Sequence, residues 1–229
     1  GLPSPAPSGV KRVVIGPMTR TVQIARTWKT RLIHVGVHPE NCHDFVPQHI
    51  DILRELAQQE KVVAIGEIGL DYYWEENAPR DTQVDLFCRQ LELSNDLGLP
   101  VIIHDREAHG DTMECLKKYK PAGVLHCFSG SVEMMKEATK LGMYIGLGGV
   151  VTFKNARKAI EVAAEAPLDK LVLETDAPYM APVPYRGKRN NSTYIAEVAE
   201  KIAEVRGMDA QELVDICTEN GKRLFQMND

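Results

Sequence analysis

The sequence predicts an α/β fold, a (β/α)8 barrel of the TIM type whose first strand we do not find in this chain. Short segments rich in Val, Ile and Leu alternate with longer amphipathic segments along all 229 residues. The apolar segments are continuous, which is typical of strands buried on both faces of a parallel sheet. Seven such strands without a linker favour a closed barrel, with an open doubly wound sheet as the alternative.

The expected strands are apolar runs that end in polar or turn-forming residues. The segment before Val10 is rich in Pro and cannot supply a central strand, because proline lacks the N–H that a sheet interior needs. We therefore expect residues 1–9 to be a flexible start and residues 10–229 to form a single barrel domain. The runs are Val10–Gly16, Leu32–Pro39, Val62–Asp71, Pro100–Arg106, Gly123–Ser129, Met143–Val151 and Leu171–Pro178.

The helices between the strands have recognisable ends. Pro47 and Pro79 suit the first positions of two helices, and Gly98 follows the second where a left-handed C-cap is common. Asp111 and Asp209 each precede a glutamate by three residues, a capping pattern that predicts two further helix starts. The expected helices include Pro47–Glu60, the segment from Pro79 to Leu97, Asn191–Arg206 and Ala210–Phe225.

Charge and composition exclude several classes of protein. Acidic residues outnumber basic residues by 32 to 27, so any DNA contact must rest on a local basic patch or on metal ions. No apolar run approaches the roughly 18 residues of a membrane span, and the start lacks signal-peptide features. The five cysteines form no Cys-x-x-Cys pair, which fits free thiols in a reducing compartment. We expect a cytoplasmic protein without membrane contact, and the sequence implies no protein partner.

Titratable residues lie at the carboxyl ends of five expected strands. In a barrel these ends carry the active site, because the βα loops meet there. One buried histidine is commonly a satisfied core residue, but five ligand-type residues at one end are hard to explain by packing. Since His, Glu and Asp bind divalent metals, we expect a metal centre that activates water and holds phosphate oxygens. The residues are His38, Glu67, His104, His126 and Asp176.

Six motifs follow one another in order, within a match that runs from about residue 10 to the end of the chain. They are Gly36-Val-His-Pro39, Ala64-Ile-Gly-Glu-Ile-Gly-Leu-Asp-Tyr-Tyr73, Pro100-Val-Ile-Ile-His-Asp-Arg106, Leu125-His-Cys-Phe-Ser-Gly130, Leu173-Glu-Thr-Asp-Ala-Pro-Tyr179 and Asn220-Gly-Lys-Arg-Leu-Phe225. Each motif alone is weak evidence, whereas the ordered set is specific. By this set the sequence resembles the TatD-type metal-dependent deoxyribonucleases, a branch of the amidohydrolase-like barrels.

The resemblance implies a role for each ligand. Glu67 would bridge two metal ions, His104 and His126 would bind one of them, and Asp176 would bind the other. Asp176 would also accept a proton from the attacking water, so Glu67 and Asp176 are the expected catalytic residues. Glu174 shares strand parity with Asp176 and should also point into the barrel.

The chain departs from the family pattern in its first ligands. Family members usually open with a strand ending in His-x-His, which supplies two ligands to the ion of Asp176, and this sequence contains no His-x-His. The expected cofactors are divalent ions, Mg, Mn or Zn, up to two per chain. Glu67, His104 and His126 would hold one ion firmly, whereas the two carboxylates left for the other ion would hold it weakly or not at all.

Six residues are expected to contact the DNA substrate, each with a competing interpretation. Arg106 could hold a phosphate bidentately or pair with a neighbouring carboxylate. His38 either lines the cleft or caps the end of its strand. Tyr72 either stacks on a base, as its neighbour Tyr73 could, or packs within its own loop. The cations of one loop on the active-site side contact either phosphate or only water; they are Arg186, Lys188 and Arg189.

Three functions are consistent with this pattern. The resemblance implies hydrolysis of phosphodiester bonds in DNA, at the ends of the strand as an exonuclease. A small-molecule amidohydrolase or lactonase on the same ligand set is the second hypothesis, because a fold of this kind hosts many reactions. A binding module with a degenerate metal site is the third. The basic loop favours the first hypothesis over the second.

Overall fold

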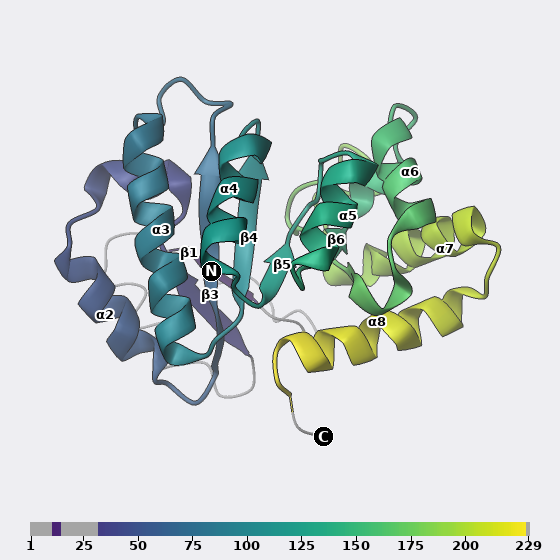
Figure 1. The fold of residues 1–229 in the computed structure, drawn as a ribbon. Helices are drawn as coiled ribbons and strands as arrows, with labels where there is room; N and C mark the ends of the chain where they lie inside the picture. Colours follow the sequence, from purple (N-terminus) through teal and green to yellow (C-terminus); the bar gives the residue numbers. More distant parts are fainter. Residues whose placement is uncertain (1–10, 15–31, 228–229) are drawn as a thin grey trace, which may run out of the picture.

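The computed structural model describes residues 11–14 and 32–227. It contains one parallel sheet with helices packed around it (Figure 1). The expected flexible start, residues 1–9, lies outside the described residues. Among the residues that the structure describes, no helix combines the length and the apolar character that crossing a membrane would require.

The sheet has seven strands in sequence order, and each strand runs parallel to the next. This order, with a helix between each pair of successive strands from β2 to β7, is that of a TIM-type barrel and confirms the predicted fold class. Within the described residues, β1 and β7 form the two edges of the sheet. The strands are β1 (Lys11–Val14), β2 (Ile33–Gly36), β3 (Val62–Asp71), β4 (Val101–Arg106), β5 (Gly123–Leu125), β6 (Tyr144–Leu147) and β7 (Leu171–Leu173).

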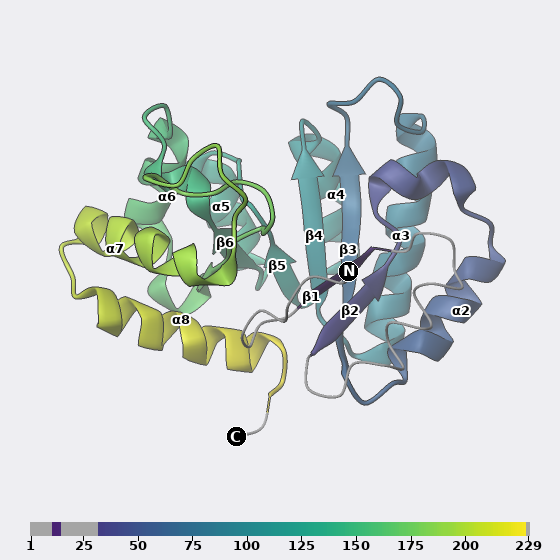
Figure 2. The same cartoon turned by 180° about the vertical axis from the view of Figure 1, so that it is seen from behind.

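The helices lie on the outside of the sheet, as Figures 1 and 2 show. Helix α3 packs on β3, α2 on β2 and β3, and α8 on β7. The α-helices are α2 (Gln48–Ala57), α3 (Arg80–Leu97), α4 (His109–Tyr119), α5 (Val132–Lys140), α6 (Arg157–Glu165), α7 (Ile195–Arg206) and α8 (Ala210–Leu224). The 3-10 turns are η1 (Pro39–Asp44), η2 (Gly149–Thr152), η3 (Leu168–Lys170) and η4 (Ser192–Tyr194).

Two of the expected cap residues end or begin their helices as predicted, and a third does not. Gly98 ends α3 in the left-handed conformation with φ 64°, and the Asp209 side chain accepts the N–H groups of Gln211 and Glu212 at the start of α8. The expectation that Asp111 caps α4 is wrong. This helix begins at His109, and Asp111 lies in its first turn, where its carboxylate accepts a hydrogen bond from another element.

Strand β3 approaches β4 closely enough to require glycine. A Cβ atom at Gly66 would lie 2.7 Å from the Cβ of Ile102, and one at Gly69, where φ is +138°, would lie 1.9 Å from the carbonyl oxygen of His104. The pairing of β3 with β4 shifts register between Gly66 and Ile68. Glu67 lies in this irregularity, so the close approach sets the position of the first site residue.

Four expected strands end earlier than their apolar runs: β2 stops at Gly36 and not at Pro39, β6 stops at Leu147 and not at Val151, and β5 and β7 are shortened in the same way. Strand β5 stops at Leu125 and β7 at Leu173, so His126 and Asp176 lie in the turns that follow. Cys127 and Asp176 adopt positive φ angles of 44° and 50°, which turn the chain away from the sheet directly after these short strands. His126 and Asp176 therefore lie just beyond the ladder, whereas Glu67 and His104 lie within β3 and β4.

Candidate metal centre

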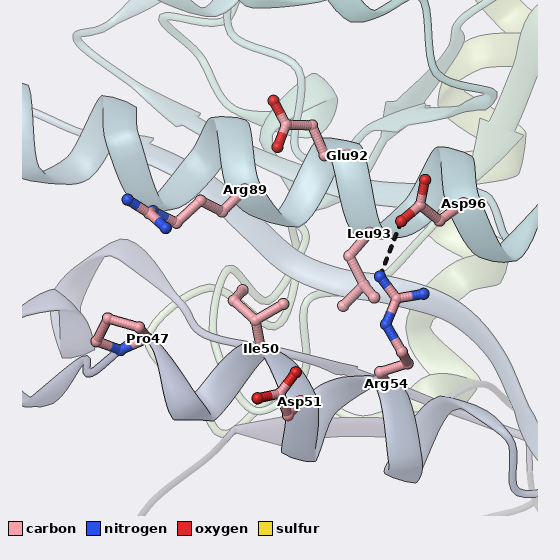
Figure 3. Close-up of a pocket in the computed structure, with 8 residues that line it drawn as sticks. All are labelled: Pro47, Ile50, Asp51, Arg54, Arg89, Glu92, Leu93 and Asp96. Atoms are coloured by element: carbon pink, nitrogen blue, oxygen red, sulfur yellow. Dashed lines mark hydrogen bonds and ion pairs between the residues drawn. The ribbon is translucent and has the colours of Figure 1, made fainter.

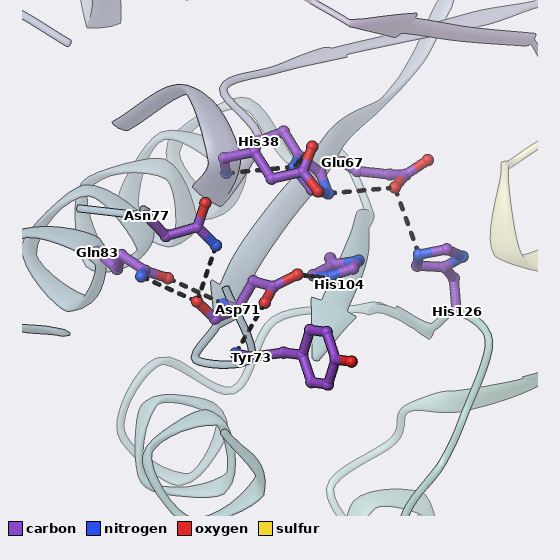
Figure 4. A network of polar contacts seen from close by, with 9 residues as sticks. His38, Glu67, Asp71, Tyr73, Asn77, Gln83, His104 and His126 are labelled. Atoms are coloured by element: carbon purple, nitrogen blue, oxygen red, sulfur yellow. Dashed lines mark hydrogen bonds and ion pairs between the residues drawn. The ribbon is translucent and has the colours of Figure 1, made fainter. Parts of the chain in front are cut away.

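Glu67 lies at the centre of a buried group of ligand-type side chains (Figure 4). Its side chain is 8% exposed. Its Oε2 atom lies 3.3 Å from Nε2 of His126 and 3.9 Å from Nε2 of His38. Ligand atoms of His38, Glu67 and His104 all lie within 4.8 Å of one another, a spacing at which one cation could contact them together.

His104 faces this group from the end of β4. Its ring centroid lies 4.5 Å from that of His38 and 5.7 Å from that of His126. Its Nε2 atom lies 3.0 Å from Oδ2 of Asp71. Because Asp71 engages Nε2, the other ring nitrogen, Nδ1, is left as the atom with which His104 could bind a metal.

Asp71 is a site residue that the sequence analysis missed. It ends β3, is fully buried, and holds His104 through one carboxylate oxygen while the other accepts the N–H of Tyr73 at 3.0 Å. Gln83 of α3 contacts both the N–H and the carbonyl of Asp71, at 2.9 and 3.0 Å, and Asn77 donates to the same carbonyl. Burial opposes ionisation of Asp71, but the hydrogen bonds from His104 and Tyr73 outweigh it and lower its pKa.

His126 has a carboxylate on each side. Its Nε2 faces Glu67, and its Nδ1 lies 3.5 Å from Oε2 of Glu174, which follows β7. The other oxygen of Glu174 accepts the N–H of Cys127. Burial opposes protonation of His126, but Glu174, with smaller contributions from Glu67 and Asp176, raises the pKa of the ring to about 9. His104 and His126 are thus each supported from behind by a carboxylate, Asp71 and Glu174 respectively.

Asp176 lies in the turn after β7, close enough to His126 for its charge to act on that ring. The amide nitrogen of the buried Asn190 side chain donates to the carbonyls of Thr175 and Tyr179, each at 2.6 Å. These two hydrogen bonds fix the turn that carries Asp176. The two ends of the 175–190 segment are therefore tied to each other beside Asp176.

The expected substrate residues fall into two groups. His38 is buried beside Glu67 and also accepts the N–H of Glu40, so it both faces the centre and caps the turn η1. The guanidinium carbon of Arg106 lies 3.8 Å from the ring centroid of Tyr73, at the rim of the site. Tyr72 points elsewhere, because its hydroxyl donates to Asp111 at 2.6 Å and its ring packs against the core.

The cations of the 186–189 loop are exposed. Arg186 lies over the ring of Phe153 at 3.9 Å, and Lys188 lies 6.0 Å from the ring of Tyr185, which itself stacks on Tyr194. These contacts anchor the loop to aromatic side chains and leave its positive charge facing solvent. A surface pocket between α2 and α3 (Figure 3), where Arg54 pairs with Asp96 at 2.8 Å, lies on the outside of the fold and gathers no comparable ligand group.

Comparisons with known proteins agree on one family. The family model described as TatD related DNase matches residues 9–226. An uncharacterized metal-dependent hydrolase, YabD of Bacillus subtilis, is 42% identical over 223 residues, covering 94% of this chain and 87% of YabD. The 3′-5′ ssDNA/RNA exonuclease TatD of Salmonella typhimurium is 33% identical and covers 91% and 83% of the two chains. The crystal structure of YjjV, a TatD homologue from Escherichia coli, superposes with a TM-score of 0.84 at 32% identity over 92% of this chain and 82% of YjjV.

Proposed function

The chain belongs to the family of TatD related DNases, and we propose that it is a metal-dependent hydrolase that cleaves phosphodiester bonds of DNA from the ends of the strand. The names of its relatives support the reaction class: one is a metal-dependent hydrolase and another a 3′-5′ exonuclease of single-stranded DNA and RNA. The observation that carries the proposal is the arrangement of His104 and His126 around Glu67, each imidazole with a carboxylate behind it.

The donor set fits a divalent cation. Glu67, His104 and His126 supply one oxygen and two nitrogen atoms, and Asp176 adds a carboxylate from the neighbouring turn. Such a mixed set suits Mn or Zn, and an oxygen-richer second site suits Mg or Mn. When bound, the cation would polarise a phosphate oxygen and lower the pKa of a water molecule.

The side chains of the protein supply the remaining steps. Asp176, on a turn that Asn190 fixes, accepts the proton of the attacking water. Asp71 and Glu174 hold the imidazoles in one orientation, so that the ligand nitrogens stay directed at Glu67. Arg106 neutralises a phosphate oxygen at the rim, which lowers the energy of the more negative transition state.

The test is chelator-sensitive shortening of a labelled oligonucleotide. The protein with Mg²⁺ or Mn²⁺ should shorten it stepwise, and EDTA should stop the reaction. Glu67→Gln should abolish cleavage, whereas Glu137→Gln, which removes an exposed carboxylate paired with Lys117, should leave it unchanged. A simple lactone and an amide are assayed in parallel. Cleavage that survives EDTA or Glu67→Gln, or turnover of the lactone without any of DNA, would overturn the proposal.

A further inference from the structure

Two large aromatic side chains next to the candidate metal centre are exposed. Tyr73 is 52% exposed and Trp74 is 42% exposed. Their rings meet edge to face, with centroids 4.8 Å apart and planes at 88°. Exposed aromatic rings forgo the free energy that burial would supply, so a pair held together at the rim of a site points to a ligand that covers them.

Arg106 completes this cluster. Its guanidinium carbon lies 3.8 Å from the Tyr73 ring centroid and 5.2 Å from that of Trp74. Arg106 also ends β4, two residues beyond His104. Burial raises the pKa of Asp71, its hydrogen bonds with His104 and Tyr73 lower it, and the charge of Arg106 adds a smaller lowering effect. The cation is therefore held by the aromatic rings at the edge of the buried centre.

A short series of hydrogen bonds fixes the cluster relative to the centre. The N–H of Tyr73 donates to Oδ1 of Asp71 at 3.0 Å, and Oδ2 of the same carboxylate lies 3.0 Å from Nε2 of His104 (Figure 4). Asp71 itself is fully buried and held by Gln83. A ligand on the aromatic rings would thus be held at a defined offset from the side chains that bind the metal.

This combination matches one class of ligand. Aromatic rings stack on nucleobases of any sequence, and arginine binds phosphate oxygens bidentately. The net charge of −5 argues against capture of nucleic acid by the general field of the protein, so local stacking must contribute more of the binding. A ring can stack on a base only where that base is free of its duplex neighbours, which selects single-stranded ends.

We propose that Tyr73, Trp74 and Arg106 form a stacking site for one unpaired nucleobase next to the scissile phosphate. The base lies on the exposed aromatic surface that Trp74 provides, and Arg106 holds the adjoining phosphate. This inference rests on the proposed nuclease function and adds to it the residues that select a single-stranded substrate. These residues act on substrate binding and not on the metal.

The experiment measures binding apart from cleavage. Fluorescence anisotropy with Mg²⁺ present follows a labelled single strand with phosphorothioate linkages, which resist hydrolysis. Trp74→Leu should weaken binding by about 5- to 150-fold, the range for loss of one base–aromatic stack. Trp74→Phe, which keeps a ring, should restore most of the affinity. A second strand that carries abasic sites at its terminal positions should bind weakly to the unmodified protein and lose less than about twofold on Trp74→Leu, because no base is left to stack.

The outcomes separate the two proposals. Equal losses with the intact and the abasic strand, or no loss with either, would overturn the stacking site, whether or not DNA is cleaved. Binding that depends on Trp74, in a protein that cleaves no DNA with any metal, would leave the stacking site standing and overturn the nuclease function. A full-length chain that binds no single strand would overturn the stacking site outright. An unchanged thermal midpoint of Trp74→Leu confirms that the exposed ring can be removed without unfolding.

Discussion

Replacement of Asp71 by Asn should weaken metal binding although the residue is not itself a proposed ligand. The carboxylate of Asp71 accepts from Nε2 of His104 and so keeps the proton on that nitrogen. An asparagine of the same size can still accept the N–H of Tyr73 with its carbonyl oxygen, and it then turns its NH₂ group toward His104. An NH₂ group requires an acceptor, which favours the tautomer with the proton on Nδ1, the nitrogen needed by the metal.

The size of the effect follows from the burial of the pair. Asp71 is 0% exposed and His104 is 18% exposed, so water cannot readily replace the lost contact. Removing the hydrogen-bond partner behind a metal-binding imidazole costs about 10- to 100-fold in metal affinity or activity. Because Gln83 and Asn77 hold the backbone of Asp71 and not its carboxylate, strand β3 should keep its position in Asp71→Asn.

Isothermal titration of the metal-free protein with Mn²⁺ or Zn²⁺ measures this loss directly. Asp111→Asn is the matched control, since the carboxylate of Asp111 accepts a hydrogen bond from Tyr72, the neighbour of Tyr73, but contacts no proposed metal ligand. The control should bind metal as the unmodified protein does. Equal affinities of Asp71→Asn and the unmodified protein would show that His104 does not bind metal through Nδ1, and the assignment of the centre would have to change.

Two further predictions concern stability. The hydrogen bond from His109 to Asp105 at 2.8 Å raises the pKa of His109. The stability that this pair contributes is therefore present below the unfolded pKa of about 6.5 and is lost as the pH rises through the folded pKa. His109→Gln should lower the free energy of unfolding in urea by at most about 1 kcal/mol at pH 5.5 and should leave it unchanged at pH 9. Gly69→Ala would place a Cβ atom 1.9 Å from the carbonyl oxygen of His104 and should lower the free energy of unfolding by more than about 3 kcal/mol. Gly207 also has a positive φ but open space around it, so Gly207→Ala should lower the free energy of unfolding by only about 1 kcal/mol. Similar losses in the two variants would refute the close approach of β3 to β4 as the cause.

The strands were predictable from the sequence because their hydrophobicity is continuous. Strand β3 matches its apolar run from Val62 to Asp71, since both of its neighbours pair with it and helices cover it. The apolar runs that begin with β5 and β7 extend beyond the last residues of these strands, because apolar character alone does not show where the hydrogen-bonded ladder ends. The expected cap of α4 failed for a related reason. Asp111 has the right residue type and spacing, but Tyr72, 39 residues away in sequence, uses its carboxylate.

The candidate site was predictable to the extent that its residues end strands. His38 and His126 follow strands and His104 lies near the end of β4, whereas Glu67 lies within β3, and the structure brings the four together. Asp71 was not predicted although it ends β3, because Glu67 on the same strand already supplies a ligand-type residue. Its signal was a charged residue at the end of a fully buried run, four positions beyond Glu67 and therefore on the same face. The partner of each carboxylate, as for Glu174 and His126, depends on contacts between strands that residue spacing does not encode.

The charges around the centre explain why a cation should bind there. Carboxylates outnumber the permanent cations around the centre: the acidic side chains are Glu67, Asp71, Glu174 and Asp176, the permanent cation is Arg106, and the imidazoles facing the carboxylates are His38, His104 and His126. Glu67 and Asp71 are buried, so their negative charges are screened less than those of exposed carboxylates. In the metal-free protein a proton on His126 relieves part of this excess, which is the physical meaning of its raised pKa. A divalent cation relieves more of it from the same position, so the carboxylates that orient the imidazoles also create the field that attracts the metal.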